Sequence, residues 1–506
     1  MDILERIIEN LTSDEVRRFK ILSNRFKADE EKKLLVLFDA IRAGDYKSIE
    51  DEVVTQFYGD TSPKSKNSYY RLRNKLLSNL EKSLLFYHFN YKNSIEAYSN
   101  IQLSILFRER GLYREAFYNL KKAEKVATDN DQFNILEVIY SEMVGLAAYL
   151  EVDIESVIER RKENLKKIEI MRANREVLGM VTQHMIKRNF ARSKKSESVI
   201  ETLESVKERL EEHKGIFHST SGKIMILRTV VSILIQKSAF KELEEYVKET
   251  YEDFSNNNLF NKDNHATRLM LRIWRINSLQ KLHDLEAANE EIEFLYEELK
   301  MYNRQNFNEL AFHYYSSRVF NLKLTGDLDG AGETLKEAFG IKEILQNDVH
   351  ELYLLISRAD QFFSQELYSK AQETIRKIKA HKGYSFLDEE LRFYIHIFEI
   401  VNCFEARDYK SAESSFKSLR KTYKPFFKDD FYGKAVKFIE IVMRMNTAAV
   451  EGKKVFIKSA YKNFIASYPS SEIGDNQIFP YEIYLQSKLD DEDNYYQLLL
   501  KSLKKR

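Results

Sequence analysis

The sequence predicts an all-α protein built from repeated helix pairs. The prediction rests on scarce turn residues, on apolar residues at helical spacing, and on a pattern that recurs every 40 to 45 residues. The 506 residues include only 15 glycines and 4 prolines, which sheet-rich folds need at hairpin turns and phosphate loops. We therefore expect neither an all-β fold nor a doubly wound nucleotide-binding fold nor a β/α barrel.

Residues 1–92 show no repeat and are predicted to form a helical bundle. Thr12 and Glu15 have the spacing of a capping box that opens a helix. Two further short helices are expected over 32–42 and 48–59, and a long basic helix follows Ser62 and Pro63. Short helices before a longer basic one are compatible with a helix-turn-helix.

The long helix carries most of the positive charge of this region. Residues 61–92 have a net charge of +6, and basic side chains beside Ser, Asn and Tyr can contact both phosphates and base edges. The candidate nucleic-acid contacts are Lys64, Lys66, Arg71, Arg73 and Lys75. The alternative, which we favour, is that the leucines of this helix form a buried stripe and that the charges are its solvated side. That stripe would consist of Leu72, Leu76, Leu77, Leu80 and Leu84.

A helical repeat begins after residue 92. From Tyr113, the residues Ala116, Leu120, Ala123 and Ala127 follow at steps of 3, 4, 3 and 4, which is one face of an α-helix. Equivalent anchor positions lie at 116, 243, 288, 331, 371 and 412, and the last five are 45, 43, 40 and 41 residues apart. Degenerate copies are expected at Ile154 with Val157 and near Val199, and a final copy at Ile457, Ala460 and Phe464. Stacked pairs bury a continuous core that one pair cannot form.

The repeated Gly-x-Tyr/Leu-x-x-Ala…Leu…Ala pattern resembles the second half of a tetratricopeptide repeat. The match is good at 111–127 and 326–341 and partial at 366–378 and 407–419. The resemblance implies a right-handed α-solenoid of antiparallel helix pairs over residues 93–468, followed by a C-terminal loop and capping helix over 469–506. The period exceeds the roughly 34 residues of the family, so we expect longer helices or longer loops.

The resemblance also places a ligand groove along the first helix of each pair. Such grooves bind extended peptides or partner helices through aromatic pockets and a few polar clamps. Carried over onto this chain, the candidate groove positions are Ile105, Arg108, His313, Ser316, Lys323, Asp360 and Phe363.

Two further charged stretches lie within the repeat region. Residues 160–195 have a net charge of +9, whereas 284–298 hold seven acids and no base. Like charges three or four residues apart on a helix repel, so a partner of opposite charge would relieve this cost. Solvated helix faces are the simpler explanation.

No catalytic motif appears. The ten histidines form no HExxH pair, and no phosphate loop or GxSxG elbow is present. The single cysteine, Cys403, lies in an apolar segment and is expected to be a buried small side chain. We therefore predict no enzyme activity, no catalytic residue, no metal site and no cofactor.

The remaining expectations concern compartment and function. The net charge is +1, the N-terminal segment lacks the basic and then apolar pattern of a signal peptide, and the longest apolar run spans 12 residues, 224–235. A cytoplasmic protein without membrane contact is expected. The predicted function is a non-catalytic scaffold or adaptor that binds a protein or peptide. The alternative is a nucleic-acid-binding transcriptional regulator with a helix-turn-helix-like N-terminal domain and a sensor solenoid.

Overall fold

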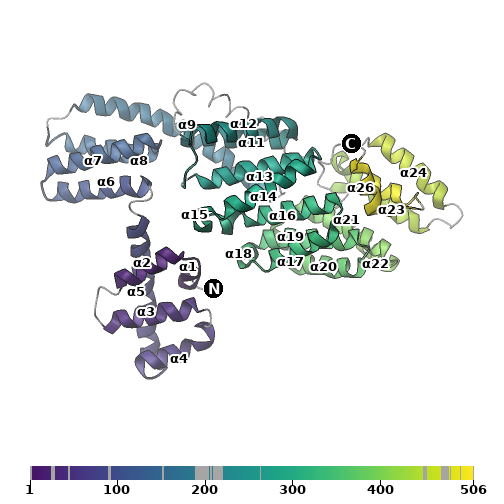
Figure 1. Ribbon diagram of the computed structural model, residues 1–506, viewed down its shortest axis with the longest axis horizontal. Helices are drawn as coiled ribbons and strands as arrows, with labels where there is room; N and C mark the ends of the chain where they lie inside the picture. Colours follow the sequence, from purple (N-terminus) through teal and green to yellow (C-terminus); the bar gives the residue numbers. More distant parts are fainter. Residues whose placement is uncertain are drawn as a thin grey trace. The chain divides into compact units, whose positions relative to one another are not determined.

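The computed structural model describes most of the chain as α-helix (Figure 1). The described residues are 3–23, 29–43, 46–88, 93–150, 153–187, 220–262, 264–447, 453–468, 480–490 and 492–504, with the single positions 204, 208 and 478. They form 25 α-helices, three short 3₁₀ helices and no strand. The all-α prediction is confirmed. None of the described helices is long and apolar enough to cross a membrane.

The chain divides into two compact units, Met1–Glu169 and Ile170–Arg506. The first holds α1 (Ile3–Glu9), α2 (Ser13–Ser23), α3 (Asp29–Arg42), α4 (Tyr46–Tyr58), α5 (Pro63–His88), α6 (Asn93–Glu109), α7 (Tyr113–Asp129), α8 (Phe133–Leu146) and the start of α9 (Ile154–Lys187). The domain boundary predicted at residue 92 falls in a segment outside the described residues, and it stays a prediction.

The second unit contains the longer series of helices. In chain order these are α11 (Thr220–Lys237), α12 (Phe240–Asn256), α13 (His265–Lys281), α14 (Leu285–Leu299), α15 (Met301–Arg304), α16 (Phe307–Thr325), α17 (Leu328–Phe339), α18 (Lys342–Leu345), α19 (Asp348–Ser364), α20 (Tyr368–Ala380), α21 (Glu389–Glu405), α22 (Tyr409–Thr422), α23 (Gly433–Thr447), α24 (Lys453–Ser467), α25 (Tyr481–Ser487) and α26 (Tyr495–Lys504).

The first five helices pack around an apolar core. The capping box predicted before α2 is present, because the Thr12 amide donates to Glu15 Oε2 at 2.8 Å and the Glu15 amide donates to Thr12 Oγ1 at 3.3 Å. Along α5, the core is formed by Tyr69, Leu72, Leu76 and Leu80. These positions recur every three or four residues, so the long basic helix buries one face, as the leucine-stripe interpretation expects.

Consecutive helix pairs pack side by side after α5. The pairs are α6 with α7, α11 with α12, α13 with α14, α16 with α17, α19 with α20, and α21 with α22. The predicted anchor positions Ala116, Leu243, Ala288, Ala331, Ala371 and Ala412 are all buried. Of the degenerate copies, Val157, Ile457 and Phe464 are buried, whereas the position near Val199 lies outside the described residues. Small buried residues allow neighbouring helices to approach closely, and the helix-pair prediction is confirmed.

The extra length of the repeat lies between the pairs. Short helices follow α14 and α17, namely α15 and α18, and 3₁₀ turns at 384–386, 426–428 and 430–432 follow α20 and α22. The first helices are also long, at 17 residues in α13, α19 and α21 and 19 in α16. Both expected sources of the longer period are therefore present.

Each of these pairs turns through a residue in the left-handed conformation. The residue lies five positions before the anchor, and the amide after it donates to the carbonyl five residues back, as Leu367 does to Phe362 at 2.8 Å. This is the Schellman arrangement that satisfies free carbonyls at a helix end. The left-handed residues are Gly111, Ser238, His283, Gly326, Glu366 and Arg407. Glycine adopts this conformation without steric cost. Four of the six positions carry other residues, so the sequence does not show that the same turn recurs in every pair.

Buried amide side chains join successive pairs. Asn321 donates to the Leu285 carbonyl at 3.0 Å, Gln361 to that of Leu328 at 2.9 Å, and Asn402 to that of Tyr368 at 3.0 Å. Each amide lies five residues before the left-handed residue of its pair, and each acceptor is the first residue of the preceding second helix. These hydrogen bonds fix the register between neighbouring pairs.

Replacing the left-handed residue of the last turn tests the turn geometry. Arg407→Gly is expected to raise the free energy of unfolding by about 0.5–1 kcal/mol, because relief of the left-handed strain exceeds the entropy that glycine adds to the unfolded chain. Gly326→Ala should lower it by about 1–2 kcal/mol. Denaturant unfolding measures both. The control Glu413→Gly places glycine at an exposed position inside helix α22 and should lower the free energy of unfolding by roughly 1 kcal/mol. If Arg407→Gly lowered the free energy of unfolding by the same amount, the proposed turn geometry would be contradicted.

Removal of one buried amide tests the contact between pairs. Asn402→Ala deletes the hydrogen bonds of a fully buried amide to the Tyr368 carbonyl and to Gln372 Oε1, both on α20, and should lower the free energy of unfolding by about 1–3 kcal/mol. Gln365→Ala removes an amide that donates to the exposed Asp329 at 3.3 Å, and should change stability by less than about 0.5 kcal/mol. Equal effects of the two substitutions in urea unfolding would argue against a register role.

Candidate functional site

Three of the predicted groove residues lie together in the second unit. Lys323 at the end of α16 forms an ion pair with Asp360 of α19, and both side chains are nearly buried. Phe363 lies one turn further along α19 and is buried. We call the surface formed by Lys323, Asp360 and Phe363 the groove face.

The groove face is covered by a helix of the same chain. The Tyr496 hydroxyl of α26 donates to the Lys323 carbonyl at 2.5 Å, although the two residues are 173 positions apart. The ring of Tyr495 meets that of Phe363 edge to face, with centroids 5.7 Å apart. The Lys323 carbonyl belongs to the last turn of α16, where carbonyls lack a full helical partner. Helix α26 therefore occupies the place where the sequence predicted a peptide or partner helix.

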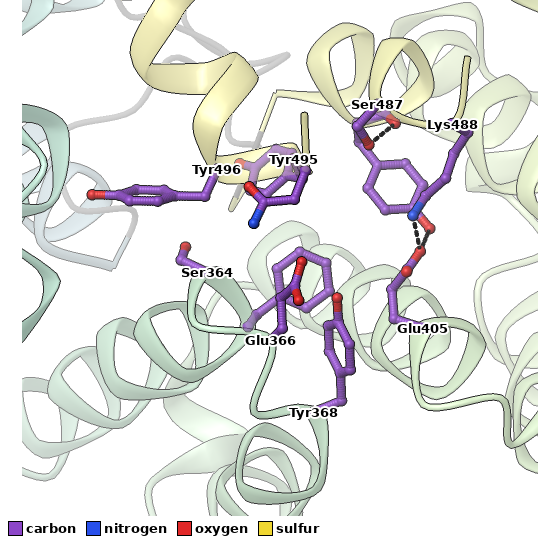
Figure 2. Close-up of a pocket in the computed structure, with 11 residues that line it drawn as sticks. Ser364, Glu366, Tyr368, Glu405, Ser487, Lys488, Tyr495 and Tyr496 are labelled. Atoms are coloured by element: carbon purple, nitrogen blue, oxygen red, sulfur yellow. Dashed lines mark hydrogen bonds and ion pairs between the residues drawn. The ribbon is translucent and has the colours of Figure 1, made fainter. Parts of the chain in front are cut away.

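A small polar cavity lies beneath the docked helix (Figure 2). Its volume is about 90 Å³, and its lining comes from the ends of α19 and α21, the start of α20, and α25 and α26 with the residues between them. Ser364 lies across this space from Tyr496, and its hydroxyl is buried without a hydrogen-bond partner among the described residues. The space is far below the roughly 300–1,000 Å³ of a drug-sized ligand pocket. It is a packing gap under α26 rather than a preformed pocket for a metabolite.

Helix α25 is fastened at the far side of this cavity. Glu405 at the end of α21 accepts a hydrogen bond from the Tyr484 hydroxyl. It also forms an ion pair with Lys488, whose Nζ lies 2.7 Å away. Lys488 Nζ also lies 4.9 Å from the centre of the Tyr484 ring. Burial raises the pKa of the Tyr484 and Tyr495 phenols well above 10 and that of Tyr496 to about 12. The three phenols are therefore uncharged at neutral pH.

Two predicted groove residues on α16 face a different cluster. The Ser316 hydroxyl donates to the His313 carbonyl of its own helix at 3.2 Å. The rings of His313 and His350 lie 6.3 Å apart, and Phe312 stacks on His350 at 4.2 Å. Burial lowers the pKa of both imidazoles to about 4, so both are uncharged at neutral pH. This cluster packs α16 against α19.

The remaining groove residues, Ile105 and Arg108, belong to the first unit. Arg108 on α6 forms an ion pair with Glu142 of α8 at 2.5 Å, and Ile105 is partly buried. Arg108 therefore joins neighbouring first helices, in the way that Lys323 and Asp360 do in the second unit.

Several of the candidate nucleic-acid residues on α5 contact other residues of the N-terminal helices. Lys66 pairs with Asp51 of α4 at 2.9 Å, and Arg73 lies over the Tyr69 ring at 5.9 Å. Lys75 is partly buried and also has an interaction, while Lys64 and Arg71 are exposed. The nearby hydroxyl of Ser65 is buried against Asp60. Contacts of this kind are those of an ordinary helix surface.

The charged stretches find partners on neighbouring helices. In the first unit, Arg160 pairs with Glu124 and Arg161 with Glu137, both at 2.5 Å. Residues 188–195 of the basic stretch lie outside the described residues.

In the second unit, the acids of α14 meet three arginines of α13. Arg268 and Arg272 bind Glu298 at 2.8 and 2.7 Å, and Arg272 and Arg275 bind Glu291 at 2.5 and 2.6 Å. From the sequence we favoured solvated helix faces for these charges and did not identify the arginines of the adjacent helix as partners of the acids.

One group of potential metal ligands occurs among the residues that the structure describes. Side-chain atoms of Asp348, Glu351 and His381 lie within 4.8 Å of one another. However, Asp348 pairs with Lys382 at 2.9 Å, and His381 Nδ1 accepts the Gly383 amide at 3.0 Å. A neutral imidazole that accepts at Nδ1 carries its proton on Nε2, which lies 3.1 Å from Glu351. These contacts explain the group as a structural cluster that closes the turn after α20.

Comparison with known proteins adds no family. No protein-family model matches the chain, and no curated protein matches it.

The two half-buried imidazoles of His313 and His350 predict a pH dependence of stability. Their pKa is about 4 in the folded protein and about 6.5 in an unfolded chain, so only the unfolded state takes up protons as the pH falls between these values. The free energy of unfolding should therefore decrease from pH 6.5 to 4.5, by at most about 1.4 kcal/mol per pH unit for each ring. Urea titrations of the unmodified protein and of His313→Gln with His350→Gln measure this; an identical slope in both proteins would contradict it.

Proposed function

We propose that the protein is a non-catalytic scaffold that binds a segment of a partner protein along the first helices of its repeats. The observation that carries this proposal is the occupation of the groove face by α26. A surface that accommodates one amphipathic helix has the shape and chemistry for another, since helix-in-groove recognition uses apolar anchors spaced along one helical face.

We further propose that the helix pairs form a tetratricopeptide-like solenoid. The support comes from the buried small anchors, from the left-handed turn five residues before each anchor, and from the amide bonds between successive pairs. A repeating register of this kind stacks pairs with a constant offset, which is the basis of a solenoid.

The nucleic-acid alternative has weaker support. Lys66 and Arg73 have contacts within the first unit, and specific DNA binding needs a set of basic side chains available to phosphates. Charge reversal at Arg71, Arg73 and Lys75 separates the two functions, because only the regulator would lose nucleic-acid binding while the fold persists.

Site-specific photocrosslinking tests the scaffold function directly. A photoreactive amino acid at Glu366, which lines the cavity beside the groove face, should trap a protein partner in native lysate treated with nuclease. The same group at Glu413, exposed on second helix α22, is the matched control. Capture at Glu366 but not at Glu413 is expected. Equal capture at both positions, or capture of nucleic acid alone in untreated lysate, would overturn the proposal.

A further inference from the structure

We propose that the partner of the groove face is an amphipathic helix that resembles α26 and displaces it. This inference rests on the proposed scaffold function and specifies its ligand. The ligand would present two adjacent aromatic side chains followed by leucines three and four positions after the first, as Tyr495, Tyr496, Leu498 and Leu499 do in α26. All four of these side chains are buried, whereas Gln497 between them is exposed.

The two C-terminal helices are attached in different ways. Helix α25 is fixed by the buried Tyr484, by the Lys488–Glu405 pair at 2.7 Å, and by the Lys434–Glu482 pair at 2.6 Å. Its Tyr481 also stacks on Phe438 of α23 with ring centres 4.0 Å apart. Helix α26 meets the groove face through the Tyr496 hydroxyl and through side chains of the same apolar core, and its Tyr495 ring lies 6.3 Å from that of Tyr484. Among the described residues, α25 has ion pairs to the array and α26 has none, so we assign the displaceable position to α26.

The packing beneath α26 is incomplete. A cavity of about 90 Å³ lies between α26 and the end of α19, beside the contact of Tyr495 with Phe363, and the Ser364 hydroxyl is buried there without a hydrogen-bond partner among the described residues. The second carboxylate oxygen of Asp360 is likewise buried and unpartnered in the part of the chain that the structure describes. Buried polar atoms without partners weaken a contact. A ligand that reaches Ser364 and Asp360 would bind the same surface better than α26 does.

The short length of α26 also favours its displacement. It has 10 residues, below the roughly 12–15 that an isolated helix needs to be even marginally stable in water. Docking of α26 must therefore also order its backbone. A longer helix in a folded partner is already ordered and loses less entropy on binding.

A binding assay with a synthetic α26 peptide tests the proposal on the full chain. The probe is a fluorescent peptide of residues 490–506, and fluorescence anisotropy measures its affinity for three proteins. Leu499→Asp disables the internal helix and leaves the groove face unchanged, so this variant should bind the peptide at least tenfold more tightly than the unmodified chain. Gln497→Asp places the same carboxylate on the exposed side of α26 and should bind like the unmodified chain. A peptide that carries Leu499→Asp should not bind.

Several outcomes would overturn the inference. Equal affinity of all three proteins would mean that α26 does not compete for the surface, and absence of binding to a folded Leu499→Asp chain would mean that the surface does not select such a helix. If circular dichroism shows that Leu499→Asp is unfolded, Tyr496→Phe replaces it. This variant loses only the hydroxyl bond to Lys323 and should bind the peptide several-fold more tightly; unchanged affinity would again reject the inference.

Two further results separate this inference from the scaffold function. A partner captured at Glu366, together with a failed peptide assay, would leave the scaffold function standing and reject an α26-like ligand. A concentration-dependent dimer of the unmodified chain in light scattering, absent in Leu499→Asp, would assign the surface to the C-terminal helix of a second copy and reject a separate partner.

Discussion

The structure depends on close approach between neighbouring helices that cannot bury their apolar faces alone. The small anchors Ala288, Ala331, Ala371 and Ala412 are almost fully inaccessible to solvent, so each second helix lies directly against its partner. The left-handed residue five positions earlier reverses the chain within a short turn, and the amide of Asn321, Gln361 or Asn402 sets the register to the previous pair. Local turn geometry and helix contact thereby specify the array without long-range pairing.

Any array of this kind has a face that its own repeats do not cover. In the second unit, part of that face is occupied by α26, which brings Tyr496 to the carbonyl of Lys323 and Tyr495 to Phe363. The contact combines the Tyr496 hydroxyl bond with buried apolar side chains, and a polar cavity of about 90 Å³ adjoins it. In the proposed scaffold function, α26 would compete with the external ligand for this face.

Much of the fold was predictable from the sequence, because the anchor spacing depends only on small and apolar residues at helical intervals. The turns were harder to predict. Ser238, His283, Glu366 and Arg407 take a conformation that favours glycine, and no composition signal marks them. The paired polar groups were also missed: the acids of α14 meet arginines of α13, and Lys323 meets Asp360. Sequence distance does not reveal which charged faces become neighbours.

The candidate site was predictable only in part. The resemblance to tetratricopeptide repeats selected Lys323, Asp360 and Phe363, which lie together, but it gave no sign that α26 would cover them. The signal was present in the adjacent aromatics Tyr495 and Tyr496 with leucines three and four residues later. We interpreted this segment only as a capping helix, since a terminal amphipathic helix is consistent with both roles.

Hydrogen exchange on the full-length protein, followed by mass spectrometry, tests the central claim most directly. If α26 is a separable occupant of the groove face, its amides will exchange orders of magnitude faster than those of α21, while α25 retains the protection of the array. If the amides of α26 are protected as strongly as those of α21 and exchange only with global unfolding, the helix is an integral part of the core and the account of a displaceable occupant is wrong.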